Sequence, residues 1–165
     1  MTTPKAKLAG LALIAALVFG TTAPAWAGWD EGVAAYDRGD YATALRDWRP
    51  LAEQGNANAQ FFLGLMYGNG LGVPRDYAKA LQWWRKAAEQ GVAGAQYNLG
   101  QMYRYGYGVP QDYVQAHMWY SLAASRFPPG EYRDNAVKNR DLVSTRMTPV
   151  QISEAQKLAR EWRPR

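Results

Sequence analysis

The sequence predicts an all-α protein built as a short solenoid of helical repeats, with a further helix that caps its C-terminal end. The main observation is a stretch that occurs twice, at 59–90 and again at 95–126. The two copies superpose after a shift of 36 residues, and 16 of the 32 aligned positions are identical. Self-similarity at a fixed period of this length is typical of a tandem repeat.

The identical positions in each copy outline a helix, a connector and a second helix. Two glycines and a proline interrupt the helical pattern midway, at 70, 72 and 74 and again at 106, 108 and 110. An aspartate follows each proline by two residues, where its carboxylate can cap the second helix. The helical residues shared by the copies, at spacings that place them on one face, are Ala59, Leu63, Gly64, Tyr67, Ala80, Ala87 and Ala88, matched by Ala95, Leu99, Gly100, Tyr103, Ala116, Ala123 and Ala124.

This pattern resembles the Sel1-like repeat, a relative of the tetratricopeptide repeat with a longer connector. The residues that carry the resemblance are AQFFLGLMYGNGLGVPRDYAKALQWWRKAAEQG and AQYNLGQMYRYGYGVPQDYVQAHMWYSLAA. The resemblance implies a short right-handed α/α solenoid, in which the first helix of each repeat lines a concave groove.

The first 27 residues predict a secretory signal peptide. An apolar run of 12 residues at 8–19 follows two lysines and precedes an Ala-Trp-Ala cleavage sequence at 25–27. A retained membrane anchor is the alternative, but the run is shorter than the roughly 20 apolar residues that a membrane span needs. We expect the mature protein to begin near Gly28 and to be exported, with the periplasm favoured over secretion.

Residues 28–58 predict an earlier and shorter repeat. Ala44, Trp48 and Ala52 lie 36 residues before equivalent positions of the next second helix, so this helix is in register. The connector before it is five residues shorter than those that follow. Terminal units of a solenoid often depart from the consensus in this way. Three repeats are therefore expected, at about 28–58, 59–94 and 95–127.

Residues 128–165 predict a C-terminal helical cap. The sequence Pro-Pro-Gly at 128–130 ends the third repeat, and the charged segment 131–145 is expected to be helical. Thr148, Pro149 and Gln151 then form a capping box with proline at the first helical position. The next helix must bury its apolar stripe, and we expect it to do so on the exposed end of the repeat stack. The stripe consists of Ile152, Ala155, Leu158, Ala159 and Trp162.

The sequence offers little catalytic chemistry, so we predict a protein that is not an enzyme and needs no cofactor or metal. There is no cysteine, and the single histidine, His117, lacks the partners that a zinc site or a general base requires. Asp76 and Asp112 recur at one repeat position, as structural caps do. Some Sel1-repeat proteins are penicillin-binding or β-lactamase-like, but no serine here begins an S-x-x-K motif. A cell-envelope hydrolase, β-lactamase-like or cell-wall-modifying, and a regulator of a membrane sensor remain the alternative functions.

Positions that differ between the repeats are the candidates for recognition, because the shared positions build the stack. The face opposite the shared stripe of the first helices predicts a concave partner-binding surface for an extended peptide or a partner helix. Its residues are Phe61, Leu65, Tyr97, Gln101, Arg104 and Tyr105. The alternative is that Phe61 and Leu65 only pack against a neighbouring helix of the stack.

The charge distribution argues against nucleic acid as a partner. Residues 28–127 hold nine basic and nine acidic residues, so the repeats are neutral. In the expected mature protein the excess of positive charge lies after residue 127, with eight basic and five acidic residues. Lys157, Arg160, Arg163 and Arg165 could therefore make a weak contact with an anionic surface.

Overall fold

The computed structural model describes residues 28–164, which form eight helices and contain no strand. The predicted all-α class is therefore confirmed, whereas the predicted signal peptide and Arg165 lie outside the described residues. The helices are α1 (Trp29–Asp37), α2 (Tyr41–Glu53), α3 (Ala57–Asn69), α4 (Tyr77–Glu89), α5 (Ala93–Tyr105), α6 (Tyr113–Arg126), α7 (Glu131–Ser144) and α8 (Pro149–Glu161).

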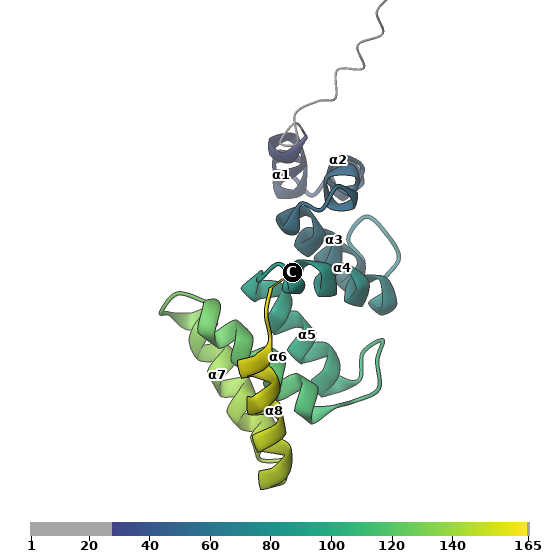
Figure 1. Ribbon diagram of the computed structural model, residues 1–165. Helices are drawn as coiled ribbons and strands as arrows, with labels where there is room; N and C mark the ends of the chain where they lie inside the picture. Colours follow the sequence, from purple (N-terminus) through teal and green to yellow (C-terminus); the bar gives the residue numbers. More distant parts are fainter. Residues whose placement is uncertain (1–27, 165) are drawn as a thin grey trace, which may run out of the picture.

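The first six helices form three helix pairs that stack in chain order into a right-handed solenoid. Each helix packs on its partner in the pair, and the second helix of one pair packs on the first helix of the next. Figure 1 shows this progression from α1 and α2 at one end to α5 and α6, with the two long connectors projecting on the same side.

An aromatic residue on each second helix packs against a glycine on the first helix of the same pair. A Cβ atom built on Gly64 would lie 2.3 Å from the Trp84 ring, and one on Gly100 would lie 2.7 Å from the Tyr120 ring. The first pair repeats this contact between Gly32 and Trp48. The helices can approach this closely because glycine has no side chain, which explains the shared glycine of the repeat.

The aspartates that follow the connectors cap the second helices, as predicted. The Asp76 Oδ1 atom accepts a hydrogen bond from the Lys79 backbone N–H at 2.9 Å, and Asp112 accepts one from Gln115 at 3.0 Å. The backbone hydrogen bond of Asp76 lowers the pKa of its carboxyl group. The carboxylate form is therefore the one that stabilises the helix start.

The connectors also join neighbouring repeats. Gly72 and Gly108 have φ angles of 68° and 69°, which favour glycine. A Cβ atom on Gly72 would lie 2.7 Å from the Cβ atom of Tyr41, at the start of α2, and one on Gly108 would lie 3.0 Å from Tyr77, at the start of α4. Each connector thus packs against the second helix of the preceding repeat.

Both C-terminal helices pack on α6. α7 follows α6 as α5 follows α4, and it buries Ala136 and Val143. α8 begins with the predicted capping box, in which the Thr148 side chain accepts from the Gln151 N–H and the Gln151 side chain accepts from the Thr148 N–H. The Trp162 ring, directly after α8, meets Trp119 of α6 edge to face, with 6.4 Å between ring centroids. The C-terminal segment therefore covers two sides of the third repeat.

None of the helices between residues 28 and 164 combines the length and the apolar character that a membrane span requires.

Candidate functional site

An open apolar pocket lies on the face formed by α3 and α5, where the predicted concave surface was expected. Its volume is about 540 Å³. Three of the six predicted partner-binding residues, Phe61, Leu65 and Tyr97, line it. The other lining residues are Asn58, Phe62, Val92, Gly94, Asn98, Phe127 and Tyr132.

Phe61 and Leu65 reach the pocket because they are four residues apart on α3 and so share a face. Both are half-buried. The Phe61 ring also packs against α5, where a Cβ atom on Gly94 would lie 2.9 Å from the ring. Phe61 therefore contributes both to the pocket wall and to the contact between neighbouring helices, which was the alternative role considered for it.

Phe127 and Tyr132 complete the pocket, and the sequence did not identify them as site residues. They flank the Pro-Pro-Gly break, and their rings stack with 5.8 Å between centroids. Tyr132 is 75% exposed. A comparison of the repeats does not identify Phe127 and Tyr132, because they follow the last repeat. They line the pocket only because α7 is placed beside it.

A polar network adjoins the pocket and ties α5 to α6 and α7. The Tyr97 hydroxyl accepts hydrogen bonds from Gln101 Nε2 at 3.0 Å and from Asn139 Nδ2 at 2.9 Å. The Tyr120 hydroxyl donates to Gln101 Oε1 at 3.0 Å, and Arg104 donates to Asn139 Oδ1. Burial raises the pKa of Tyr120, so its hydroxyl keeps the proton that it donates.

The six predicted residues consequently divide into two groups. Phe61, Leu65 and Tyr97 face the apolar pocket. Gln101, Arg104 and Tyr105 lie further along α5, where Arg104 sits 4.7 Å from the centroid of the Tyr105 ring. Tyr105 is 49% exposed. The contacts of Arg104 and Tyr97 with Asn139 show that α7 covers part of the predicted surface.

The side chains of His117, Asp76 and Asp112, which were considered for catalysis, take part in packing or in helix capping. His117 is buried on α6, and this burial lowers the pKa of its imidazole. Ser121 Oγ lies 3.5 Å from its Nδ1 atom, but the same hydroxyl donates to the His117 carbonyl oxygen at 2.8 Å. Asp76 and Asp112 cap two different helices. Within residues 28–164, no group of three or more His, Asp or Glu side chains could hold a metal ion.

The basic residues of the C-terminal helix are exposed. Lys157 lies 3.9 Å from Glu161 and is partly neutralised by it, whereas Arg160 and Arg163 face solvent.

Comparison with known proteins identifies the repeated unit. The family model described as Sel1 repeat matches residues 57–92 and 93–126. A solved structure with 33% sequence identity and a TM-score of 0.76 is that of c5321, a protective antigen present in uropathogenic Escherichia coli strains that displays an SLR fold. The match covers 85% of this chain and 30% of that protein.

A second solved structure, a Sel1 repeat protein from Oxalobacter formigenes, is 33% identical with a TM-score of 0.64. The match covers 72% of this chain and 47% of that protein, so the chain spans less than half the length of either structural relative. No curated protein matches the sequence.

Proposed function

Because the chain belongs to the Sel1-repeat proteins, we propose that it binds a peptide or a partner helix in the apolar pocket of α3 and α5. Proteins built of Sel1 repeats generally act as protein–protein interaction scaffolds, typically without enzymatic activity. The observation that carries the proposal for this chain is the pocket itself, an apolar cavity of about 540 Å³ that opens to solvent.

The pocket has the chemistry of an anchor site. Aromatic and aliphatic side chains from α3, α5 and the start of α7 surround it, so an apolar side chain of a partner would lose its contact with water there. Asn58 and Asn98 also line it, and neither side chain hydrogen-bonds to another residue between 28 and 164. Their amides are available to the backbone of a bound peptide.

The binding test uses a displayed library of random peptides selected on the immobilised protein. We expect the enriched peptides to share an aromatic or aliphatic residue, because the pocket wall offers mainly apolar contacts. Their affinities are then measured for the Leu65→Arg variant, which places a charge in the pocket, and for the Gln82→Arg variant, which changes an exposed residue of α4.

The proposal predicts that Leu65→Arg weakens peptide binding by about tenfold or more, as the loss of an interface anchor does. Gln82→Arg should leave it unchanged. Peptides that bind both variants as tightly as the unmodified protein would place the recognition surface elsewhere. Circular dichroism of each variant controls for loss of fold.

We also propose that this interaction takes place outside the cytoplasm, in the periplasm or after secretion. The support is the leader pattern of residues 1–27, with its lysines, apolar run and Ala-Trp-Ala sequence. Mass spectrometry of the protein from its host should find an N-terminus at Gly28. An intact N-terminus on cytoplasmic protein would contradict export, whereas an intact N-terminus on membrane-bound protein would favour the retained anchor.

A further inference from the structure

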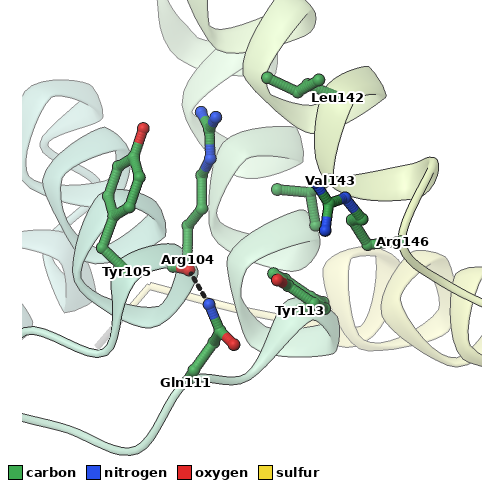
Figure 2. Close-up of a pocket in the computed structure, with 7 residues that line it drawn as sticks. All are labelled: Arg104, Tyr105, Gln111, Tyr113, Leu142, Val143 and Arg146. Atoms are coloured by element: carbon green, nitrogen blue, oxygen red, sulfur yellow. Dashed lines mark hydrogen bonds between the residues drawn. The ribbon is translucent and has the colours of Figure 1, made fainter.

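A second and smaller pocket lies where the end of α5, the following connector, the start of α6 and the end of α7 meet. Its volume is about 280 Å³. Figure 2 shows its seven lining residues, with Arg104 and Arg146 on opposite walls and Tyr113 between them. The others are Tyr105, Gln111, Leu142 and Val143.

The two arginines bring positive charge to this pocket from different elements. Arg104 belongs to α5 and is held in place by its hydrogen bond to Asn139 and by the Tyr105 ring. A guanidinium group carries five N–H donors, and the bonds to Asn139 and to the Tyr120 hydroxyl do not use all of them. Arg146 follows α7 and is exposed, and its side chain donates no hydrogen bond to any residue in 28–164.

No acidic side chain lines the pocket. The salt bridges found between residues 28 and 164 involve neither Arg104 nor Arg146. Asp112, at the start of α6, uses its carboxylate to cap that helix. No carboxylate of residues 28–164 therefore forms a salt bridge with either arginine, and an anion placed between them would be attracted by both.

The remaining lining residues restrict the kind of anion. Gln111 Nε2 donates to the Arg104 carbonyl oxygen at 2.7 Å, which fixes the connector against the end of α5. Tyr113 contributes a hydroxyl donor, whereas Leu142 and Val143 form an apolar wall. A fully hydrated inorganic ion gains nothing from such a wall, but an organic group that joins a carboxylate to an apolar chain does.

We infer that this pocket binds a carboxylate group carried on an apolar chain, such as the C-terminus of a peptide or an acidic side chain beside an aliphatic one. Guanidinium groups recognise carboxylates through paired N–H donors, and the arginines approach the pocket from two sides. The site is separate from the apolar pocket of α3 and α5. It therefore does not depend on the function proposed for that pocket.

The test follows the arginine Nε–Hε signals of the ¹⁵N-labelled protein by nuclear magnetic resonance at low salt, where charge attraction is least screened. The probe is N-acetyl-leucine, and its uncharged amide is the matched control. We expect the acid to shift the signals of Arg104 and Arg146 with saturation, and the amide to leave them unchanged. Extending the probe to dipeptides that carry the acid at the C-terminus or in a side chain distinguishes the two sources of carboxylate.

Two variants sharpen the test. Arg146→Gln removes one charge from an exposed position, and it should weaken the binding of N-acetyl-leucine by about tenfold, as loss of a charge-assisted hydrogen bond does. Arg133→Gln removes the same charge from an exposed position on α7 that does not line the pocket, and it should change nothing.

Three results would overturn the inference. One is the absence of a saturable shift of either arginine signal with the acid, or an equal shift with its amide. Another is unchanged binding to Arg146→Gln. The third is tighter binding of inorganic phosphate than of N-acetyl-leucine, which would make this a site for inorganic oxyanions.

Discussion

The second repeat, α3 with α4, and the third repeat, α5 with α6, have the same core and differ on their outer surfaces. Leu63 and Leu99 are both fully buried. On the second helices, Gln82 and Lys86 are exposed, whereas the equivalent Met118 and Leu122 are buried. α8 packs on α6, and its apolar residues join the cluster that contains Met118 and Leu122. The positions that vary between repeats therefore determine which surface accepts a further helix.

A second difference between these repeats concerns a pair of positions that change together. In the second repeat the Trp84 ring fills the space above Gly68, where a Cβ atom would lie 2.7 Å from the ring. The third repeat has Arg104 and the smaller Tyr120 at these positions. The Tyr120 hydroxyl and Arg104 then belong to the polar network that reaches Asn139 of α7. An apolar contact within one repeat has been replaced by a polar contact with the next helix.

The largest loss of stability is expected when a buried residue on the outer surface of the third repeat is replaced by its exposed equivalent in the second repeat. Leu122→Lys should lower the free energy of unfolding by about 2–4 kcal/mol, because it removes a buried leucine and places a charge under α8. Hydrogen exchange should show α8 losing protection first. Lys86→Leu is the matched control on the exposed surface of α4, and it should alter stability by less than about 0.5 kcal/mol. Unchanged protection of α8 in Leu122→Lys would show that this residue does not hold the helix.

Replacing the residues at positions 104 and 120 by those of the second repeat tests whether the two positions are energetically coupled. Tyr120→Trp should destabilise the protein by about 1–3 kcal/mol, because the larger ring meets Arg104 where the second repeat has a glycine. The double variant Arg104→Gly with Tyr120→Trp recreates the pair of the second repeat, and it should be more stable than Tyr120→Trp alone. Urea unfolding of both single variants and the double variant gives the coupling energy. Strictly additive losses would contradict the coupling.

The starts of α3 and α5 also differ in their capping, and a smaller effect on stability is expected from this difference. The Asn56 side chain accepts a hydrogen bond from the Ala59 N–H at 2.9 Å, whereas the equivalent Val92 caps nothing and lines the apolar pocket. Asn56→Ala should therefore cost about 1 kcal/mol of unfolding free energy. Asn58→Ala, an exposed asparagine in the first turn of α3, serves as the control and should be neutral. Equal losses for the two variants would argue against the cap.

The smallest expected effect depends on pH and involves His117, which replaces Leu81 of the second repeat. Burial lowers the pKa of His117 in the folded protein, with nearby Arg140 contributing in the same direction and Asp141 opposing it. The unfolded chain therefore binds a proton more readily below about pH 6.5, and stability should fall from pH 7 toward pH 5. His117→Leu should reduce this decline in urea unfolding measured at both pH values. An identical decline in both proteins would exclude His117 as its source.

The repeats could be predicted from the sequence because their signals are local. Helix spacing, the glycine and proline of the connectors and the capping aspartates all act within a few residues, and the 36-residue period repeats them. The capping box of α8 was predictable for the same reason. The capping aspartates and the capping box are formed by the residues that the sequence indicated, but α7, and not α8 as expected, covers the exposed end of the repeat stack.

The placement of α7 and its part in the site could not be predicted in this way. α7 buries only Ala136 and Val143, so its apolar stripe is too thin to indicate a packing partner. Asn139 meets Tyr97, which lies 42 residues earlier, through side chains that no local rule pairs. One feature of the sequence did point to a helix after α6. The alanines at 123–124 repeat those at 87–88, and the alanines at 87–88 pack against the helix that follows them. That repetition indicates a helix after α6, but not which of its side chains enter the site.

The most direct test of the account is the unfolding free energy of two leucine variants on the same helix. Leu63 is fully buried in the core, whereas Leu65 is half-buried and lines the apolar pocket. Leu63→Ala should cost about 2–5 kcal/mol in urea unfolding, and Leu65→Ala should cost less than half as much. Equal losses would place Leu65 in the core of the stack, and would contradict the claim that this face of α3 is available to a partner.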